Sequence, residues 1–222
     1  MLTGLIVLQK EFECFAGLAL DEFEKEHIRL MNEIHIDMIL QGLMSLEEAR
    51  VLRFKKAFEF YGVASADELS YRAAEIYRNS YVTVNRLVPG AMELITHLKK
   101  DYKIGIVTNN LTEEQLRKIR FLKIDHLIDV MVTSEDAGFT KPNPAIFNML
   151  LEKLNVMPEE AIMIGDHWRV DIEGASRLGI KCIWINVYGE DCPDKHLAVE
   201  VDSIFDTQRI ISIIDEFASV QQ

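Results

Sequence analysis

Two aspartates with a fixed spacing are the residues in this chain that most clearly suggest chemistry. Asp166 follows Gly165 directly after the apolar run 161–164, and Asp171 comes five residues later. An apolar run that stops at a carboxylate is typical of a parallel strand whose C-terminal end forms a ligand site. Carboxylate oxygens suit a hard cation such as Mg²⁺, which keeps several of its waters. The pattern therefore predicts that Asp166 and Asp171 hold Mg²⁺.

Polar groups also end two further apolar segments. Thr108 and Asn109 follow a run that ends at Val107, and Lys141 lies in the loop after residues 130–134. Ligands of an open α/β sheet bind outside the carboxyl ends of its strands, so we expect these groups to converge with the aspartates. A hydroxyl and an ammonium can bind the oxygens of a phosphoryl group and stabilise its charge during transfer. We therefore predict that Thr108, Asn109 and Lys141 bind substrate and that Thr108 and Lys141 are catalytic. This set contains no nucleophile or base.

The elements that must position these groups alternate between strands and helices from about residue 85 onward. Apolar runs typical of buried strands end near residues 108, 134, 164 and 186, with helical patterns between them. This alternation predicts an α/β fold, a Rossmann-like parallel sheet with helices on both faces. The first 84 residues carry helical patterns throughout, including a capping box at Ser45 and Glu48. We expect two domains, an all-helical one at residues 1–84 and the α/β core at residues 85–222.

The composition argues against several classes of protein. The chain has 222 residues, with 24 Lys and Arg against 36 Asp and Glu, and a formal net charge of −12. A nucleic-acid partner needs basic patches, so we expect none, whereas local groups can still bind a small phosphorylated substrate. The three cysteines form no Cys-x-x-Cys pair, the six histidines show no ligand spacing, and no apolar run has the length of a membrane span. We expect a cytoplasmic protein without a membrane partner or a zinc site, either a monomer or a homodimer.

Three of these segments, in this order, resemble motifs of the haloacid dehalogenase-like (HAD) hydrolase superfamily. Thr108 after an apolar strand is similar to motif II, Lys141–Pro144 before a helix to motif III, and Gly165-Asp166 with Asp171 to motif IV. The resemblance implies a Mg²⁺-dependent phosphohydrolase, in which an aspartate attacks the phosphoryl group and water hydrolyses the aspartyl-phosphate. It also implies that residues 1–84 are a cap domain, and that Asp171 holds the metal, its waters or Lys141. The substrate class that it suggests is a small phosphorylated metabolite such as a nucleoside monophosphate or a sugar phosphate.

One part of the family's pattern is missing from this sequence. Its first motif, Asp-x-Asp-x-Thr after an N-terminal apolar strand, supplies the nucleophile and the general acid/base. The only partial match is Leu5–Leu8 followed by Gln9, whose amide cannot serve as a carboxylate nucleophile. We therefore expect residues 3–15 to form the first helical part of the cap and the chain to begin just after that motif. The alternative is that residues 5–11 form a substitute strand in the middle of the sheet.

Two other interpretations of the function stay open. A pseudo-enzyme would keep its affinity for phosphate or metal and would act through a partner. A haloacid dehalogenase of the same superfamily needs no metal, and the pair Asp166 and Asp171 argues against it. Because the nucleophile is missing, we expect the chain as written to have little or no phosphatase activity.

Overall fold

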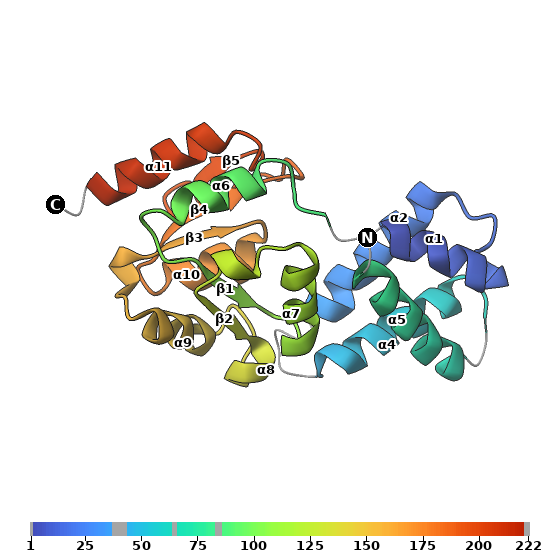
Figure 1. Ribbon diagram of the computed structural model, residues 1–222. Helices are drawn as coiled ribbons and strands as arrows, with labels where there is room; N and C mark the ends of the chain where they lie inside the picture. The colour runs from blue at the N-terminus through green and yellow to red at the C-terminus, as the bar shows by residue number, and fades with distance from the viewer. Residues whose placement is uncertain (1, 37–43, 64–65, 83–85, 220–222) are drawn as a thin grey trace. The chain divides into compact units, whose positions relative to one another are not determined.

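The helical patterns of the first 84 residues correspond to helices in the computed structural model, which describes residues 2–36, 44–63, 66–82 and 86–219. Contacts between Cα atoms divide the chain into two units, Met1–Asn85 and Arg86–Gln222. In its described residues the first unit contains α1 (Leu2–Glu11), the 3₁₀ turn η1 (Glu13–Phe15), α2 (Leu20–Leu30), the π-helical η2 (Met31–Ile36), α4 (Leu46–Phe60) and α5 (Asp67–Val82) (Figure 1).

Residues 5–11 lie within α1, so the alternative that they form a substitute strand is wrong. The helix forms because Leu5 and Leu8 are three residues apart, which places both on one helix face, whereas a strand would point them to opposite faces. Both side chains are fully buried in the apolar core of this unit. The segment 3–15 is helical as predicted, except at Phe12, where the backbone is extended between α1 and η1.

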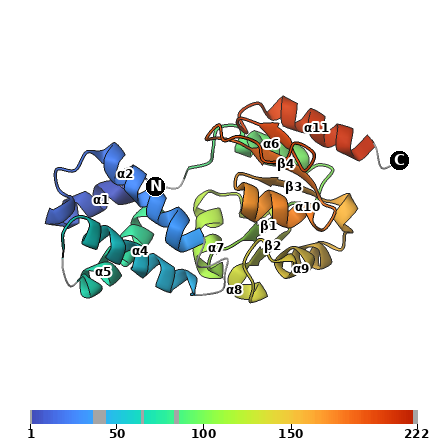
Figure 2. The same ribbon diagram turned by 180° about the vertical axis from the view of Figure 1, so that it is seen from behind.

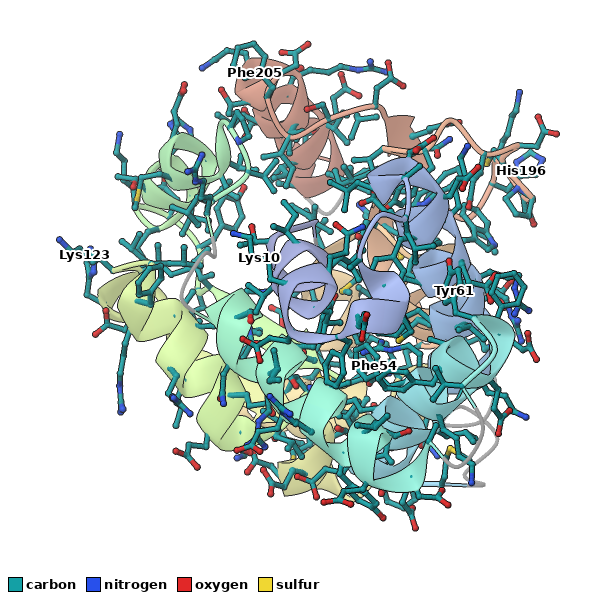
Figure 3. The ribbon with its side chains drawn as sticks, turned by 90° about the vertical axis from the view of Figure 1, so that its right-hand side faces the viewer. Lys10, Phe54, Tyr61, Lys123, His196 and Phe205 are labelled. Carbon is teal, nitrogen blue, oxygen red and sulfur yellow. The ribbon has the colours of Figure 1, made fainter. Side chains whose placement is uncertain are left out.

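Aromatic rings form the centre of that core. The ring centroid of Phe15 lies 4.7 Å from that of Phe58 and 4.8 Å from that of Phe23. Phe54 is also buried, while Lys10 on α1 is exposed, and both are labelled in Figure 3. Helix α4 begins with the predicted capping box: Ser45 Oγ accepts a hydrogen bond from the Glu48 backbone, and the Glu48 carboxylate accepts one from the Ser45 backbone at 2.8 Å. The first unit thus has its own apolar core.

The second unit alternates strands and helices. Its elements are α6 (Ala91–Leu98), β1 (Gly105–Thr108), α7 (Thr112–Phe121), η3 (Asp125–Leu127), β2 (Val130–Thr133), α8 (Ser134–Ala137), α9 (Pro144–Leu154), η4 (Pro158–Glu160), β3 (Ile162–Gly165), the π-helical η5 (Trp168–Ile172), α10 (Glu173–Ser176), β4 (Lys181–Ile185), β5 (Val199–Val201) and α11 (Thr207–Ser219) (Figures 1 and 2). All strand pairs are parallel: β1 pairs with β2, β3 with β4, and β4 with β5. This confirms the predicted α/β class.

Strand β4 shows how helices cover both faces of the sheet. Cys182 and Trp184 point to one face, where they pack in a cluster with residues of α9 and α10. Ile183 and Ile185 point to the other face, into a cluster with α6 and α11. Successive side chains of a strand alternate between faces, and a strand buried on both faces therefore reads as a continuous apolar run.

The structure differs from the sequence-based expectation in three places. The parallel strands form two separate sheets, β1-β2 and β3-β4-β5, rather than one. Strand β5 was missed because it has only three residues, one of them Glu200, and so lacks an apolar run. The helical pattern between the strands that end near residues 164 and 186 begins as the π-helical turn η5, where His167 Nδ1 caps the turn by accepting from the Val170 N–H at 3.4 Å.

Candidate functional site

A buried ion pair lies where the loops after β2 and β3 meet. Lys141 Nζ is 2.6 Å from Asp171 Oδ1, and the two side chains are 12% and 6% exposed. Charged side chains with so little exposure are rare in proteins unless they are paired. The sequence placed these residues in two different motifs, 30 positions apart, and the structure brings them into contact.

The side chain of Asn109 holds the lysine loop in place. Its amide nitrogen donates to the Lys141 carbonyl at 3.0 Å, and its amide oxygen accepts from the Lys141 N–H at 2.6 Å. Asn109 directly follows Thr108, the last residue of β1. The strand therefore positions Asn109, and Asn109 positions the backbone of Lys141. The sequence predicted Asn109 as a substrate-binding residue, and its two side-chain bonds give it a positioning role.

Past the lysine, the chain enters α9 at once. Asn143 caps this helix by accepting a hydrogen bond from the Ala145 N–H at 2.9 Å, and Pro144 occupies the first turn. Asparagine at the cap and proline in the first turn are the residues that a helix N-terminus prefers. The loop that carries Lys141 is thus fixed at one end by Asn109 and at the other by the helix start.

Gly165 allows close packing against Asp171, and Gly174 allows close packing against Phe147 and Pro142. A Cβ atom on Gly165 would lie 2.5 Å from Asp171 Cβ and 2.7 Å from Asp171 Oδ2. A Cβ atom on Gly174 would lie 2.8 Å from the Phe147 ring and 3.0 Å from the Cα of Pro142. These distances are shorter than any normal contact, so glycine at both positions is needed for this geometry.

Both oxygens of Asp171 have partners within the protein. Oδ1 faces Lys141, and Oδ2 accepts a hydrogen bond from the backbone N–H of His167 at 3.2 Å. Asp171 is 4% exposed as a whole residue, whereas Asp166 is exposed. The backbone of Asp166 is held by the indole of Trp184, whose Nε1 donates to the Asp166 carbonyl at 3.1 Å. Of the two predicted metal ligands, Asp166 is the one whose carboxylate faces solvent.

The described side chains of this region therefore offer a metal ion few donor atoms. Within the described residues no three His, Cys, Asp or Glu side chains gather closely enough to form a protein cage for an ion. Mg²⁺ is usually held by one or two carboxylates, waters and substrate phosphates rather than by such a cage. The chemistry of an exposed Asp166 beside a paired Asp171 is compatible with that mode of binding.

Two further polar side chains of this region are those of Thr108, at the end of β1, and Lys118, on α7. Thr108 is half-buried at the C-terminal end of β1 and pairs in register with Thr133 of β2. Lys118 of α7 was not predicted. Its burial lowers the pKa of its ammonium, and attraction to Asp166 partly opposes that shift. The sequence could have indicated Lys118 as a candidate, because it lies four residues after Glu114 on the buried face of α7.

The geometry and the sequence agree with one family. The chain belongs to the haloacid dehalogenase-like hydrolases, which it matches over residues 13–185. That range includes the lysine loop and both aspartates.

Curated relatives of the chain include several proteins named as phosphatases. It is 41% identical over 115 residues to a glyceraldehyde 3-phosphate phosphatase of Pyrococcus furiosus, an alignment that covers 51% of this chain and 48% of the relative. It is 32% identical over 143 residues to a ribulose-1,5-bisphosphate 5-phosphatase of Halopiger xanaduensis, covering 64% and 60%. The chain spans about half the length of the first curated relatives that it matches.

Solved structures share the fold. The HAD-hydrolase YfnB of Bacillus subtilis, solved bound to magnesium, superposes with a TM-score of 0.77 at 22% identity, covering 94% of this chain and 89% of that one. A 2-haloacid dehalogenase of Pseudomonas syringae superposes with a TM-score of 0.61 at 21% identity, covering 95% and 90%. At this level of identity the likeness supports the fold and not a particular activity.

In the described residues, the helices lack the length and apolar character needed to cross a membrane.

Proposed function

We propose that this chain carries the phosphate and metal site of a Mg²⁺-dependent phosphohydrolase that acts on a small phosphorylated metabolite. The observation that carries the proposal is the buried Lys141–Asp171 pair, held next to the exposed Asp166 at the C-terminal ends of parallel strands. The relatives named as phosphatases support the reaction class, and their names share a phosphate ester of a small molecule as substrate. A sugar phosphate or a nucleoside monophosphate belongs to this class.

Each residue has a distinct role in the proposal. The ammonium of Lys141 and the hydroxyl of Thr108 bind phosphoryl oxygens and stabilise the charge that develops on them. Asn109 fixes the loop of Lys141, and Asp171 orients the ammonium. Asp166 provides the carboxylate for Mg²⁺, which when bound would neutralise phosphate charge. In this proposal residues 1–84 act as a cap that selects the substrate, in a cytoplasmic protein that is a monomer or a homodimer.

Within the described residues the site contains no carboxylate that can be assigned as nucleophile. Asp171 is engaged on both oxygens, and Asp166 is assigned to the metal. The proposal therefore separates two properties of this chain: it binds phosphate and Mg²⁺, and it turns substrate over slowly or not at all. The second candidate function, a phosphate-binding pseudo-enzyme that acts through a partner, rests on this same observation.

Binding and turnover can be measured separately. Isothermal titration with inorganic phosphate, with and without Mg²⁺, should show saturable binding that Asp166→Asn weakens only when Mg²⁺ is present. Lys141→Met should weaken phosphate binding under both conditions. An equal loss in both variants with and without Mg²⁺ would contradict the assigned roles.

Turnover is then tested with a panel of phosphate monoesters, including glyceraldehyde 3-phosphate, a nucleoside monophosphate and p-nitrophenyl phosphate. We expect little or no release of phosphate by the chain as written. Robust turnover that a chelator abolishes would confirm the phosphohydrolase and overturn our assignment of a site without a nucleophile. Turnover of a haloacid that a chelator leaves unchanged would refute the phosphohydrolase.

A further inference from the structure

The indole of Trp184 makes a hydrogen bond to the backbone of Asp166. Its Nε1 donates to the Asp166 carbonyl oxygen at 3.1 Å. Trp184 belongs to β4, which pairs in parallel with β3, and its partner in register is Gly165, the last residue of β3 (Figure 1). The bond therefore runs from one strand to the first residue after the neighbouring strand, at the end of the sheet where the candidate site lies.

The same indole also contacts the loop after β3 at a second point. The ring of Trp168, at the start of η5, lies edge-on to the ring of Trp184, with centroids 5.0 Å apart and an interplanar angle of 76°. Both rings are buried, in the apolar cluster that also contains Ile172 and Cys182. A large side chain in such a densely packed cluster has little freedom to move. Trp184 is therefore a rigid support for residues 166–168.

The carboxylate of Asp166 depends on this support in a way that the carboxylate of Asp171 does not. Both oxygens of Asp171 are bonded to the protein, one to the Lys141 ammonium and one to the backbone. Asp166 is exposed, and in the part of the chain that the structure describes its carboxylate takes part in no hydrogen bond or ion pair. The position of this carboxylate is therefore set by the backbone of Asp166, which Trp184 holds.

A second charged residue of the site is held in the same manner. Asn109, which follows β1, bonds the backbone of Lys141 through its side-chain amide. Trp184 of β4 bonds the backbone of Asp166 through its indole. In each case a side chain at the end of one strand fixes a residue that presents its charge to the site. Groups that hold a metal ligand in place without touching the ion commonly change metal affinity about 10–100-fold when they are removed.

We propose that Trp184 is a positioning residue of the metal site, whose indole N–H fixes the backbone of Asp166 and so sets the affinity of this chain for Mg²⁺. Trp184 acts through Asp166 and supplies no ligand itself, because an indole N–H is a donor only. Without the bond, the backbone of Asp166 would have to become ordered when the ion binds, and the loss of conformational entropy opposes binding. This inference rests on the proposed function, which assigns Mg²⁺ to Asp166.

The coupling between this hydrogen bond and the ion is reciprocal. If the bond raises the affinity for Mg²⁺ by a certain factor, bound Mg²⁺ stabilises the bond by the same factor. The chain has two tryptophans, so its NMR spectrum contains two indole N–H signals, which Trp168→Phe assigns. We expect Mg²⁺ to slow the exchange of the Trp184 indole N–H with solvent about tenfold. The Trp168 indole donates no hydrogen bond within the described residues, so its exchange should stay unchanged.

A matched pair of variants separates the donor from the packing of the ring. Benzothienylalanine keeps the shape of the tryptophan side chain and has sulfur in place of the indole N–H. For Trp184→benzothienylalanine we expect the affinity for Mg²⁺, measured by isothermal titration, to fall about tenfold. Phosphate binding without Mg²⁺ should be unchanged, because the Lys141 loop keeps its own hydrogen bonds to Asn109. Trp168→benzothienylalanine is the control and should change neither affinity.

Three results would overturn the proposal. An unchanged affinity of Trp184→benzothienylalanine for Mg²⁺ would show that the hydrogen bond has no effect on the ion. An equal loss of Mg²⁺ affinity in the variant at position 168 would assign the effect to ring packing and not to the donor. A loss of phosphate binding without Mg²⁺ by the same factor would show that the variant loosens the whole site.

A measurement without metal separates this inference from the proposed function. The His167 N–H donates to Asp171 Oδ2 at 3.2 Å, so its hydrogen exchange reports whether the loop after β3 is held in place. Trp184→benzothienylalanine should speed this exchange about fivefold, the factor that one ordinary hydrogen bond supplies. Faster exchange in a chain that fails to bind Mg²⁺ would support the positioning of Asp166 and count against the proposed function. Unchanged exchange, together with Mg²⁺ binding that Asp166→Asn abolishes, would overturn the positioning role alone.

Discussion

Replacing Asp171 by asparagine removes the negative charge from the most buried ion pair of the site and leaves its shape nearly unchanged. The carboxamide could still accept from the His167 N–H, but the Lys141 ammonium, on a side chain only 12% exposed, would lose its counter-charge. Loss of one partner of a buried pair typically costs about 3–5 kcal/mol, against about 0–1 kcal/mol for an exposed pair. Since the pair is 2.6 Å long and nearly buried, we expect Asp171→Asn to lower the free energy of unfolding by about 3 kcal/mol.

The coupling energy of the ion pair is measured by a double-mutant cycle that combines Asp171→Asn with Lys141→Met. Each single variant leaves one charge without its partner, whereas the double variant leaves none, so the double variant should lose far less than the sum of the two. We expect a coupling energy of about 2–3 kcal/mol. The matched control is the pair Arg177 and Glu173, whose side chains are 66% and 33% exposed and whose coupling should stay below about 0.5 kcal/mol.

Tryptophan fluorescence during urea unfolding is the natural assay. The chain has two tryptophans, Trp168 and Trp184, and both belong to the second unit. They are 6% and 1% exposed, with ring centroids 5.0 Å apart, so their emission should shift to the red when this unit unfolds. A coupling energy for Lys141 and Asp171 no larger than that of the control pair would refute the inference that this ion pair is electrostatically buried.

Three further predictions concern packing, reactivity and capping. Gly165→Ala should lower the free energy of unfolding in urea by about 1–3 kcal/mol, because the added Cβ would clash with Asp171. Gly105→Ala should lower it by less, since its Cβ meets only the movable ends of leucine side chains. Equal losses in the two variants would contradict the inference that Gly165 is needed for the close approach of Asp171. Burial raises the pKa of the Cys182 thiol from 9.0 to about 12. Its reaction with iodoacetamide at pH 8, followed by mass spectrometry, should therefore be about a thousandfold slower than that of a free thiol. Rapid labelling of the native chain would contradict the burial of this thiol. Ser45→Ala should lower the stability of the first unit by about 1 kcal/mol, measured by circular dichroism, and an unchanged midpoint would show that the capping box contributes nothing.

Local patterns explain why much of the fold could be predicted. The strand that ends at Thr108 and the strand that ends at Gly165 have apolar runs and stop at polar residues, which is a signal that needs no knowledge of distant contacts. The capping box at Ser45 is equally local, since all its partners lie within three residues. Strand β5 was missed for the opposite reason, because three residues carry almost no periodic signal.

The site shows the same division between local and distant information. The types and order of Lys141, Asp166 and Asp171 indicated a phosphate and metal site, and the structure places Lys141 and Asp171 in direct contact. The hydrogen bonds of Asn109 to the Lys141 backbone could not be predicted, because a carboxamide can bind a ligand or a backbone, and only the fold brings the Lys141 backbone to it.

The sequence by itself determined the fold class, the strand ends that carry polar groups and the absence of a nucleophile from those ends, because periodicity and residue type are properties of neighbouring positions. Only the tertiary structure decided that the carboxylate of Asp171 is bonded to the Lys141 ammonium and the His167 N–H. It also decided that Asp166 is exposed to solvent and that the sheet is divided between β1 and β3. These facts depend on contacts between segments far apart in the chain. Such contacts are set by how whole elements pack, and no local pattern of residues contains that information.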